Sequence, residues 1–234
     1  MIKRKNAFAL VRDGFLTLKR LAADGRFWGA YVFIFGVFNL VAAQVVTSTP
    51  DDWAGHLKMS FYIGSNLSLF FTTAVLLLLG KSNQEFTGKR IVGDIWRVWK
   101  ANFVAGLYII LGFICFVIPG IILVVRYLYV DEAVVLEGQP ITESLRRSRK
   151  LSSFNGGTLL ISYGIVLVCY FLVVMVAGAV VGVISEPALD SFLFNYFVEI
   201  AVTAMTTMFA TVGYNGYLEA IAGTEAVRLE SKHN

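Results

Sequence analysis

Long apolar runs separated by short polar segments constrain this chain more than any other feature. Most of the runs approach or exceed the roughly 20 residues that an α-helix needs to cross about 30 Å of hydrocarbon. They lack the regular apolar–polar alternation of membrane β-barrel strands. The runs therefore predict membrane-spanning helices near residues 27–49, 60–80, 101–118, 121–136, 157–184 and 190–213.

The composition agrees with a membrane protein. Of the 234 residues 57% are hydrophobic and only 15% are charged, too few to cover the surface of a soluble globule of this size. The first apolar run has no small-residue cleavage site, so no cleavable signal peptide is expected. We predict an all-α integral membrane protein with one membrane domain over residues 27–213. A basic amphipathic segment, 1–26, precedes this domain, and a tail, 214–234, follows it.

The basic residues predict the topology. Sixteen of the 20 basic residues fall in segments 1–26, 81–100 and 137–156. The positive-inside rule places all three segments on the cytoplasmic side of the membrane. A single long helix over residues 101–136 would put the third segment outside, so the chain is expected to reverse direction within that stretch.

Pro119 and Gly120 are the predicted site of the reversal, because proline ends a helix and glycine accepts the backbone angles of a tight turn. This gives a polytopic bundle of about six transmembrane helices in three hairpins, with both termini cytoplasmic. The return helix over 121–136 would be only about 24 Å long. It also contains Arg126, so a full span and a re-entrant hairpin both remain open.

The three basic segments are expected to form amphipathic cytoplasmic helices in the headgroup region. Their simplest role is to fix topology and to anchor the chain to anionic lipid. A more specific site for anionic lipid headgroups is the alternative, and its candidate contacts are Arg146, Arg147, Arg149 and Lys150. Nucleic-acid binding is not expected, because the basic residues are needed at the bilayer and no recognition module is present.

Five polar residues are predicted to lie in the outer half of the membrane. Ionisable groups there cost several kcal/mol unless they are paired or hydrated, so Arg126 and Glu199 are natural counter-ions. The network is either a clamp that fixes helix register or a water-accessible cavity for an ion or polar headgroup. Asp131, Glu132 and Glu137 are expected nearer the cytoplasm, hydrated or paired with Arg146 and Arg147. The five network residues are Arg126, Glu199, Asn39, Asn66 and Asn195.

The chain has no recognisable catalytic constellation. It contains only two histidines, His56 and His233, and no metal-ligand spacing, phosphate loop or nucleophile elbow. Cys115 and Cys169 lie in apolar runs, where thiols usually pack as small hydrophobes. No catalytic residue, metal or cofactor is therefore predicted.

One stretch resembles a known family. Pro119-Gly120, Arg126, the run from Val134 to Gly138 and the run from Ser144 to Leu151 together resemble the signature of YciC-type bacterial inner-membrane proteins. The same pattern is similar to the membrane domain attached to some glycerophosphoryl diester phosphodiesterases. This chain has Ser144 where such proteins more often have alanine, and Ser153-Phe154-Asn155 where a Gly-Asn is more usual. The resemblance implies a polytopic protein of the bacterial inner membrane and does not extend to the phosphodiesterase catalytic domain.

Two functions are consistent with these patterns. The first is a non-enzymatic multi-pass inner-membrane protein that supports envelope or lipid organisation by binding lipid or a membrane-protein partner. The alternative is a small transporter or flippase-like carrier that uses the outer-half polar network, as a homo-oligomer. A carrier requires that network to line a solvent-accessible cavity, whereas a scaffold requires a dry, packed bundle.

Overall fold

The computed structural model describes residues 5–25, 27, 74–76, 78, 88–184 and 187–233. All regular secondary structure in these residues is helical, which confirms the predicted all-α class. The predicted spans 27–49 and 60–80 fall almost entirely outside them. The helices are α1 (Ala7–Ala22), α4 (Gly88–Cys115), α5 (Val117–Arg126), α6 (Val130–Leu136), α7 (Ile141–Ile184) and α8 (Pro187–His233).

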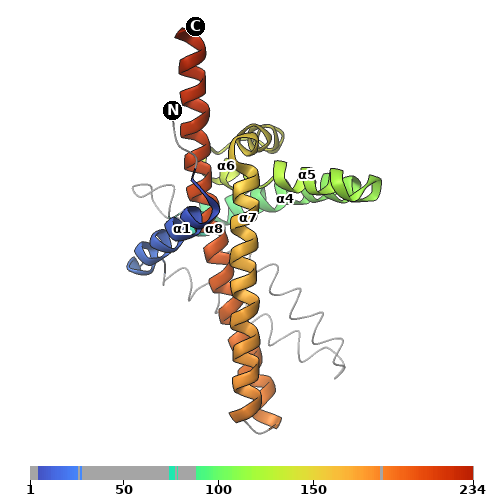
Figure 1. Cartoon of the computed structure of the whole chain (residues 1–234), viewed down its shortest axis with the longest axis vertical. Helices are drawn as coiled ribbons and strands as arrows, with labels where there is room; N and C mark the ends of the chain where they lie inside the picture. Colours follow the sequence, from blue (N-terminus) through green and yellow to red (C-terminus); the bar gives the residue numbers. More distant parts are fainter. Residues whose placement is uncertain are drawn as a thin grey trace.

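The longest feature is an antiparallel pair formed by α7, of 44 residues, and α8, of 47 residues (Figure 1). Proline suits the first position of α8, because its fixed φ is helical and its missing N–H would have no partner there. The predicted spans 157–184 and 190–213 both lie in this pair. In α7 the basic segment that precedes the span belongs to the same helix, and in α8 the polar tail that follows the span does so too.

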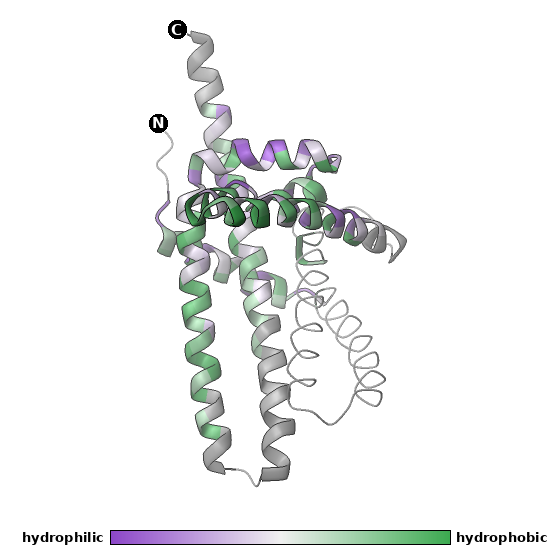
Figure 2. Cartoon of the chain, turned by 90° about the vertical axis from the view of Figure 1, so that its right-hand side faces the viewer, coloured by the Kyte–Doolittle hydropathy of each residue, from purple (hydrophilic) through white to green (hydrophobic). Residues whose placement is uncertain are grey.

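Two described segments, Gly93–Cys115 and Ile141–Val176, are long and apolar enough to cross a membrane. Only 22% and 17% of the most apolar 18-residue stretch of each segment is buried within the protein, whereas the core helix of a soluble protein would be mostly buried. Figure 2 shows the long part of α7 as largely hydrophobic. Large exposed apolar surfaces of this kind are rare on soluble monomers and are suited to lipid. The count of six spans stays a prediction.

The chain reverses between α4 and α5, as predicted, but not at Pro119 and Gly120. Phe116 is extended, with φ −168° and ψ 155°, and joins the end of α4 directly to the start of α5. Pro119 lies in the first turn of α5, where its missing N–H needs no partner. Gly120 instead allows close packing, because a Cβ added there would lie 2.5 Å from the Phe113 ring, and one added at Gly112 would lie 3.1 Å from the Gly120 Cα atom.

The predicted single helix over residues 121–136 is wrong. α5 ends at Arg126, and a turn over residues 127–129 leads into α6. Hydroxyl groups of α7 stabilise this break: Ser148 donates a hydrogen bond of 2.9 Å to the Arg126 carbonyl, and the Tyr129 N–H donates one of 3.0 Å to Ser148 Oγ. Ser152 also donates to the Arg126 carbonyl, at 3.3 Å. The backbone groups freed by the break are therefore satisfied by another helix.

The α4–α5 hairpin lies crosswise to the long axis of the α7–α8 pair in both views (Figures 1 and 2). The first turns of α7, the hydrophilic helix near the top of Figure 2, also turn away from its long straight part. If α7 and α8 cross the bilayer, this hairpin therefore lies closer to the membrane plane than to its normal. Such an arrangement suits the re-entrant alternative better than a full span.

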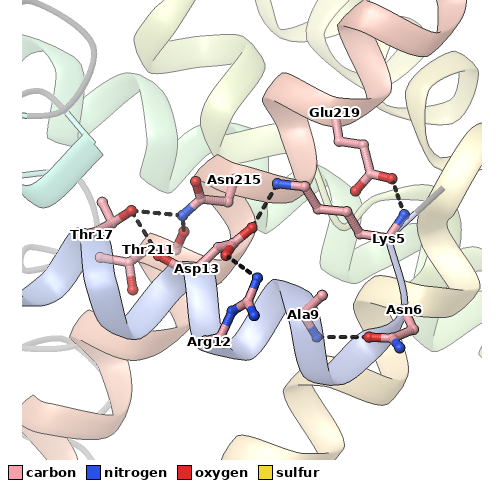
Figure 3. Close-up of polar contacts among 9 residues, drawn as sticks. All are labelled: Lys5, Asn6, Ala9, Arg12, Asp13, Thr17, Thr211, Asn215 and Glu219. Carbon is pink, nitrogen blue, oxygen red and sulfur yellow. Dashed lines mark hydrogen bonds and ion pairs between the residues drawn. The ribbon is translucent and has the colours of Figure 1, made fainter. Parts of the chain in front are cut away.

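Helix α1 packs across α8 and forms several polar contacts with it (Figure 3). Asn6 caps the helix by accepting a hydrogen bond of 2.8 Å from the Ala9 N–H. The Lys5 N–H donates to Glu219 Oε1 at 2.8 Å, and Asn215 Nδ2 donates to Thr17 Oγ1 at 3.0 Å. The predicted amphipathic segment is thus docked on the tail end of α8.

Short helix α6 is the most buried of the described helices. Val130, Ala133, Val134 and Val135 are each at most 2% exposed. They pack against α4 on one side and against α7 and α8 on the other. This places the polar side chains of α6 inside the protein, where their partners matter most.

Candidate functional site

A basic groove of about 960 Å³ lies between α5 and the start of α7. Its cations are Arg126, Arg146, Arg149 and Lys150, and its apolar surface comes from Ile121, Ile122 and Val125. Residues 146, 149 and 150 share one helical face, because residues three and four apart are neighbours on an α-helix. The tertiary fold adds Arg126 from α5 to this face.

Positive charge in the groove is not neutralised by the described residues. Within the described part of the chain, none of the four cations forms an ion pair. The Arg149 guanidinium lies over the Tyr127 ring, 5.6 Å from its centroid. Arg126 is in the last turn of α5, where the helix dipole favours a cation. Four cations around one groove repel one another, so a bound anion would stabilise the arrangement.

Arg147 differs from its three predicted companions. Its Nε donates a hydrogen bond of 2.9 Å to Glu137 Oε1, within an ion pair on the protein side of the helix. The Tyr217 hydroxyl donates to the same carboxylate oxygen. The predicted pairing of Glu137 with this basic cluster is therefore confirmed for Arg147, which joins α7 to the end of α6 and is not among the residues that line the groove.

The described backbone does not bring Arg126 to the level of Glu199. Asn155 Nδ2 donates a hydrogen bond of 2.9 Å to the Gly216 carbonyl, so these two residues lie at the same level of the α7–α8 pair. Asn155 is about one helical turn from Ser152, whose hydroxyl donates to the Arg126 carbonyl, so Arg126 lies near the level of Gly216. Glu199 lies roughly 17 residues earlier on α8, or roughly 25 Å along the helix. Arg126 and Glu199 would reach the same depth only if α5 ran parallel to α7 and α8, whereas α5 lies crosswise to them.

The other members of the predicted network cannot be placed in the same way. Asn39 and Asn66 lie outside the described residues. Asn195 and Glu199 are on α8, but their side chains are outside the described part of the structure. Their participation in a shared polar network stays a prediction.

A buried polar junction joins three elements near the start of α6. The Tyr129 hydroxyl donates a hydrogen bond of 2.6 Å to Asn155 Oδ1, and the amide of the same asparagine donates to the Gly216 carbonyl. Tyr129 is fully buried and Asn155 is 4% exposed. Gly216 lets the helices approach, because a Cβ there would lie 2.9 Å from the tyrosine oxygen. This junction fixes α8 against α7 and the α5–α6 turn.

A second, acidic cavity of about 330 Å³ lies beside α6. Its polar lining is Asn102, Asp131, Glu132 and Tyr163, contributed by α4, α6 and α7. Asn102 Nδ2 donates a hydrogen bond of 2.7 Å to Asp131 Oδ1. Glu132 is 3% exposed, and its Oε2 atom has no hydrogen-bond partner. Asp131 and Glu132 are expected to be hydrated or to pair with Arg146 and Arg147, but neither arginine lines this cavity, and no ion pair among the described residues joins them to these two carboxylates.

Burial changes the titration of these carboxyl groups. Desolvation raises the pKa of Glu132, and the neighbouring Asp131 charge raises it further. Desolvation also raises the pKa of Asp131, although the Asn102 hydrogen bond opposes the shift. Both groups therefore keep a proton to a higher pH in the folded protein than in the unfolded chain. Their contribution to stability is full below the pKa of the unfolded chain, and it is lost as the pH rises through the higher pKa of the folded protein.

Sequence reasoning found the basic cluster but missed the acidic cavity. The available signal was the pair Asp131-Glu132 inside a run otherwise rich in valine, leucine and tyrosine. A single helix over residues 121–136 would carry this pair to the cytoplasmic interface, whereas the break after Arg126 turns α6 into the protein. Tyr163 and Asn102 have no local signal, because they reach the cavity from other helices.

A scan against protein-family models and searches of curated proteins and solved structures found no match to this chain. The resemblance to YciC-type proteins therefore stays a prediction.

Proposed function

We propose that this chain is a non-enzymatic multi-pass protein of the bacterial inner membrane that binds anionic lipid headgroups in the basic groove. Through lipid or partner binding it would support envelope or lipid organisation. The groove carries the proposal: four cations from two helices, with no ion pair among the described residues, surround an apolar surface. Arg126, Arg146, Arg149 and Lys150 suit a phosphate, and the apolar surface suits the first carbons of an acyl chain.

The exposed side chains support an interfacial position for the crosswise helices. Trp96 and Trp99 of α4 are 55% and 42% exposed, and their rings stack with centroids 5.1 Å apart. Phe8 and Phe15 of α1 are also exposed. Aromatic residues among cations favour the headgroup region, where a ring meets lipid while the charge meets water. In this proposal α7 and α8 cross the bilayer and both termini are cytoplasmic.

Replacement of Arg126 and Arg149 by glutamine is expected to weaken binding of phosphatidylglycerol. At about 1 kcal/mol for each basic residue near an anionic lipid, the double variant should lose about 2 kcal/mol, more than tenfold in affinity. Native mass spectrometry of the purified full-length protein, titrated with phosphatidylglycerol or phosphatidylcholine, measures this.

The matched control is the double variant Lys19→Gln/Arg20→Gln, which removes two exposed cations from the last turn of α1. A specific groove predicts little change in this control. An equal loss of affinity in both double variants would mean that the protein attracts anionic lipid only through its overall charge, and the groove proposal would fail.

A cysteine at position 118, near the tip of the α4–α5 hairpin, tests the orientation. With Cys115 and Cys169 replaced by alanine, Ile118→Cys is expected to resist an impermeant maleimide added to intact cells, because the hairpin stays near the cytoplasmic interface. Asp51→Cys, in a predicted external loop, provides the positive control. Labelling of position 118 from outside would show that the hairpin crosses the membrane.

A small transporter or flippase-like carrier is the second candidate, and the acidic cavity is the observation that favours it. Ionisable groups inside a membrane protein commonly mark a substrate or ion pathway. Lipid flux measured in vesicles reconstituted with the protein separates the two candidates, because a scaffold should produce none above that of protein-free vesicles.

A further inference from the structure

The acidic cavity is separate from the basic groove and has no role in lipid binding as proposed above. It lies between α4, the α5–α6 turn, α7 and α8, and it contains two neighbouring carboxylates, Asp131 and Glu132. Aromatic side chains of Tyr127, Tyr163 and Phe209 form part of its wall. Most of the remaining lining is aliphatic.

The negative charge of this cavity lacks a described counter-ion. Glu132 is 3% exposed with an unpartnered Oε2 atom, and Asp131 receives a hydrogen bond from Asn102. No basic side chain is among the described residues that line the cavity. A buried carboxylate without a partner is costly, so it either holds a proton or pairs with a cation from outside the chain.

Gly213 of α8 keeps room for this carboxylate. A Cβ atom at that position would collide with Glu132 Oε1 and with the Tyr163 hydroxyl oxygen. The carboxylate and the hydroxyl therefore both lie against the same bare stretch of α8 backbone. The absence of a side chain there leaves two oxygen groups close together at one end of the cavity.

We propose that this cavity binds a small organic ammonium ion, whose NH₃⁺ group pairs with Glu132 and Asp131 and whose hydrocarbon part lies against Tyr127 and Phe209. An ammonium has three donors to satisfy, and carboxylate and hydroxyl oxygens can accept them. Aromatic faces add cation–π attraction. A hard divalent ion is less suitable, because Ca²⁺ takes six to eight oxygen ligands and no group of three or more acidic, histidine or cysteine ligands occurs among the described residues.

The test uses n-butylammonium and the full-length protein in nanodiscs at neutral pH. Isothermal titration calorimetry is expected to show saturable binding to the native protein. Glu132→Gln should weaken binding at least tenfold, because it removes the charge that pairs with the ammonium. Glu225→Gln, which removes an exposed carboxylate elsewhere on α8, should leave the affinity unchanged within twofold. n-Butanol, a neutral molecule of the same shape, should not bind.

Thermal unfolding without ligand checks that Glu132→Gln is folded, and Asp131→Asn replaces it in the test if it is not. The proposal is overturned if n-butylammonium does not bind, or if it binds the native protein and the folded cavity variant equally. It is also overturned if NaCl raises the thermal unfolding midpoint of the native protein and n-butylammonium does not, since the site would then take a metal cation.

Discussion

Asn155→Ala is expected to lower the free energy of unfolding by about 3 kcal/mol. The substitution removes the only described side chain that bonds both the Tyr129 hydroxyl and the Gly216 carbonyl. Each buried polar group left unpaired costs about 1–3 kcal/mol. Denaturant unfolding of the purified protein in detergent micelles, followed by circular dichroism, measures the change.

Ser153→Ala is the matched control for this prediction. Ser153 is two residues away on the same helix, is exposed, and donates only to the Lys150 carbonyl of its own helix, at 2.7 Å. Its replacement should change stability by no more than about 0.5 kcal/mol.

In a Tyr129→Phe background the cost of Asn155→Ala should fall by about 1 kcal/mol, because one of the two groups left without a partner is already absent. If the free-energy changes of Tyr129→Phe and Asn155→Ala were strictly additive, the two side chains would not be coupled, and the junction would be contradicted.

Gly112→Val is expected to destabilise the α4–α5 hairpin by about 3 kcal/mol. A Cβ at this position would lie 3.1 Å from the Gly120 Cα atom, 3.2 Å from its nitrogen and 2.6 Å from Leu123 Cδ1. The leucine tip can rotate away, but the backbone of α5 must move to admit a branched side chain, and overpacking typically costs about 1–3 kcal/mol or more. The shift of the thermal unfolding midpoint reports the loss.

Gly93→Val provides the comparison within the same helix. A Cβ at Gly93 meets no other atom within 4 Å, so only helix propensity changes, by a few tenths of a kcal/mol. Because Gly112 holds α5 close to α4, Gly112→Val should also displace Arg126 and weaken phosphatidylglycerol binding. Equal unfolding midpoints for the two variants would show that the hairpin does not need the close glycine contact.

Local sequence signals predicted the all-helical class of the described residues, but they did not predict where the helices begin and end. The reversal within residues 101–136 followed from the basic clusters, but Phe116, an ordinary apolar residue, is where the backbone is extended. The turn is placed there because Gly112 and Gly120 can then pack against each other. The break after Arg126 depends in the same way on Ser148 and Ser152, which lie on another helix.

Local sequence likewise indicates only part of the candidate sites. The spacing of Arg146, Arg149 and Lys150 places them on one helix face. Spacing alone does not separate Arg147 from them, because it is three residues before Lys150; its ion pair with Glu137 does. No local pattern indicates that Arg126 joins that face. Nor does any local pattern bring Asn102 and Tyr163 to Asp131 and Glu132, because these residues come from three different helices.

By itself the sequence determined that the chain is helical, that two of its described segments are long and apolar enough to cross a membrane, and that its direction reverses between residues 101 and 136. These properties depend on composition, helix length and local charge, which act over a few turns. Only the tertiary structure decided that α4 and α5 lie crosswise to α7 and α8, and that Glu132 is buried without a hydrogen-bond partner for Oε2. The physical reason is that close glycine contacts and hydrogen bonds between distant helices set crossing angles and burial.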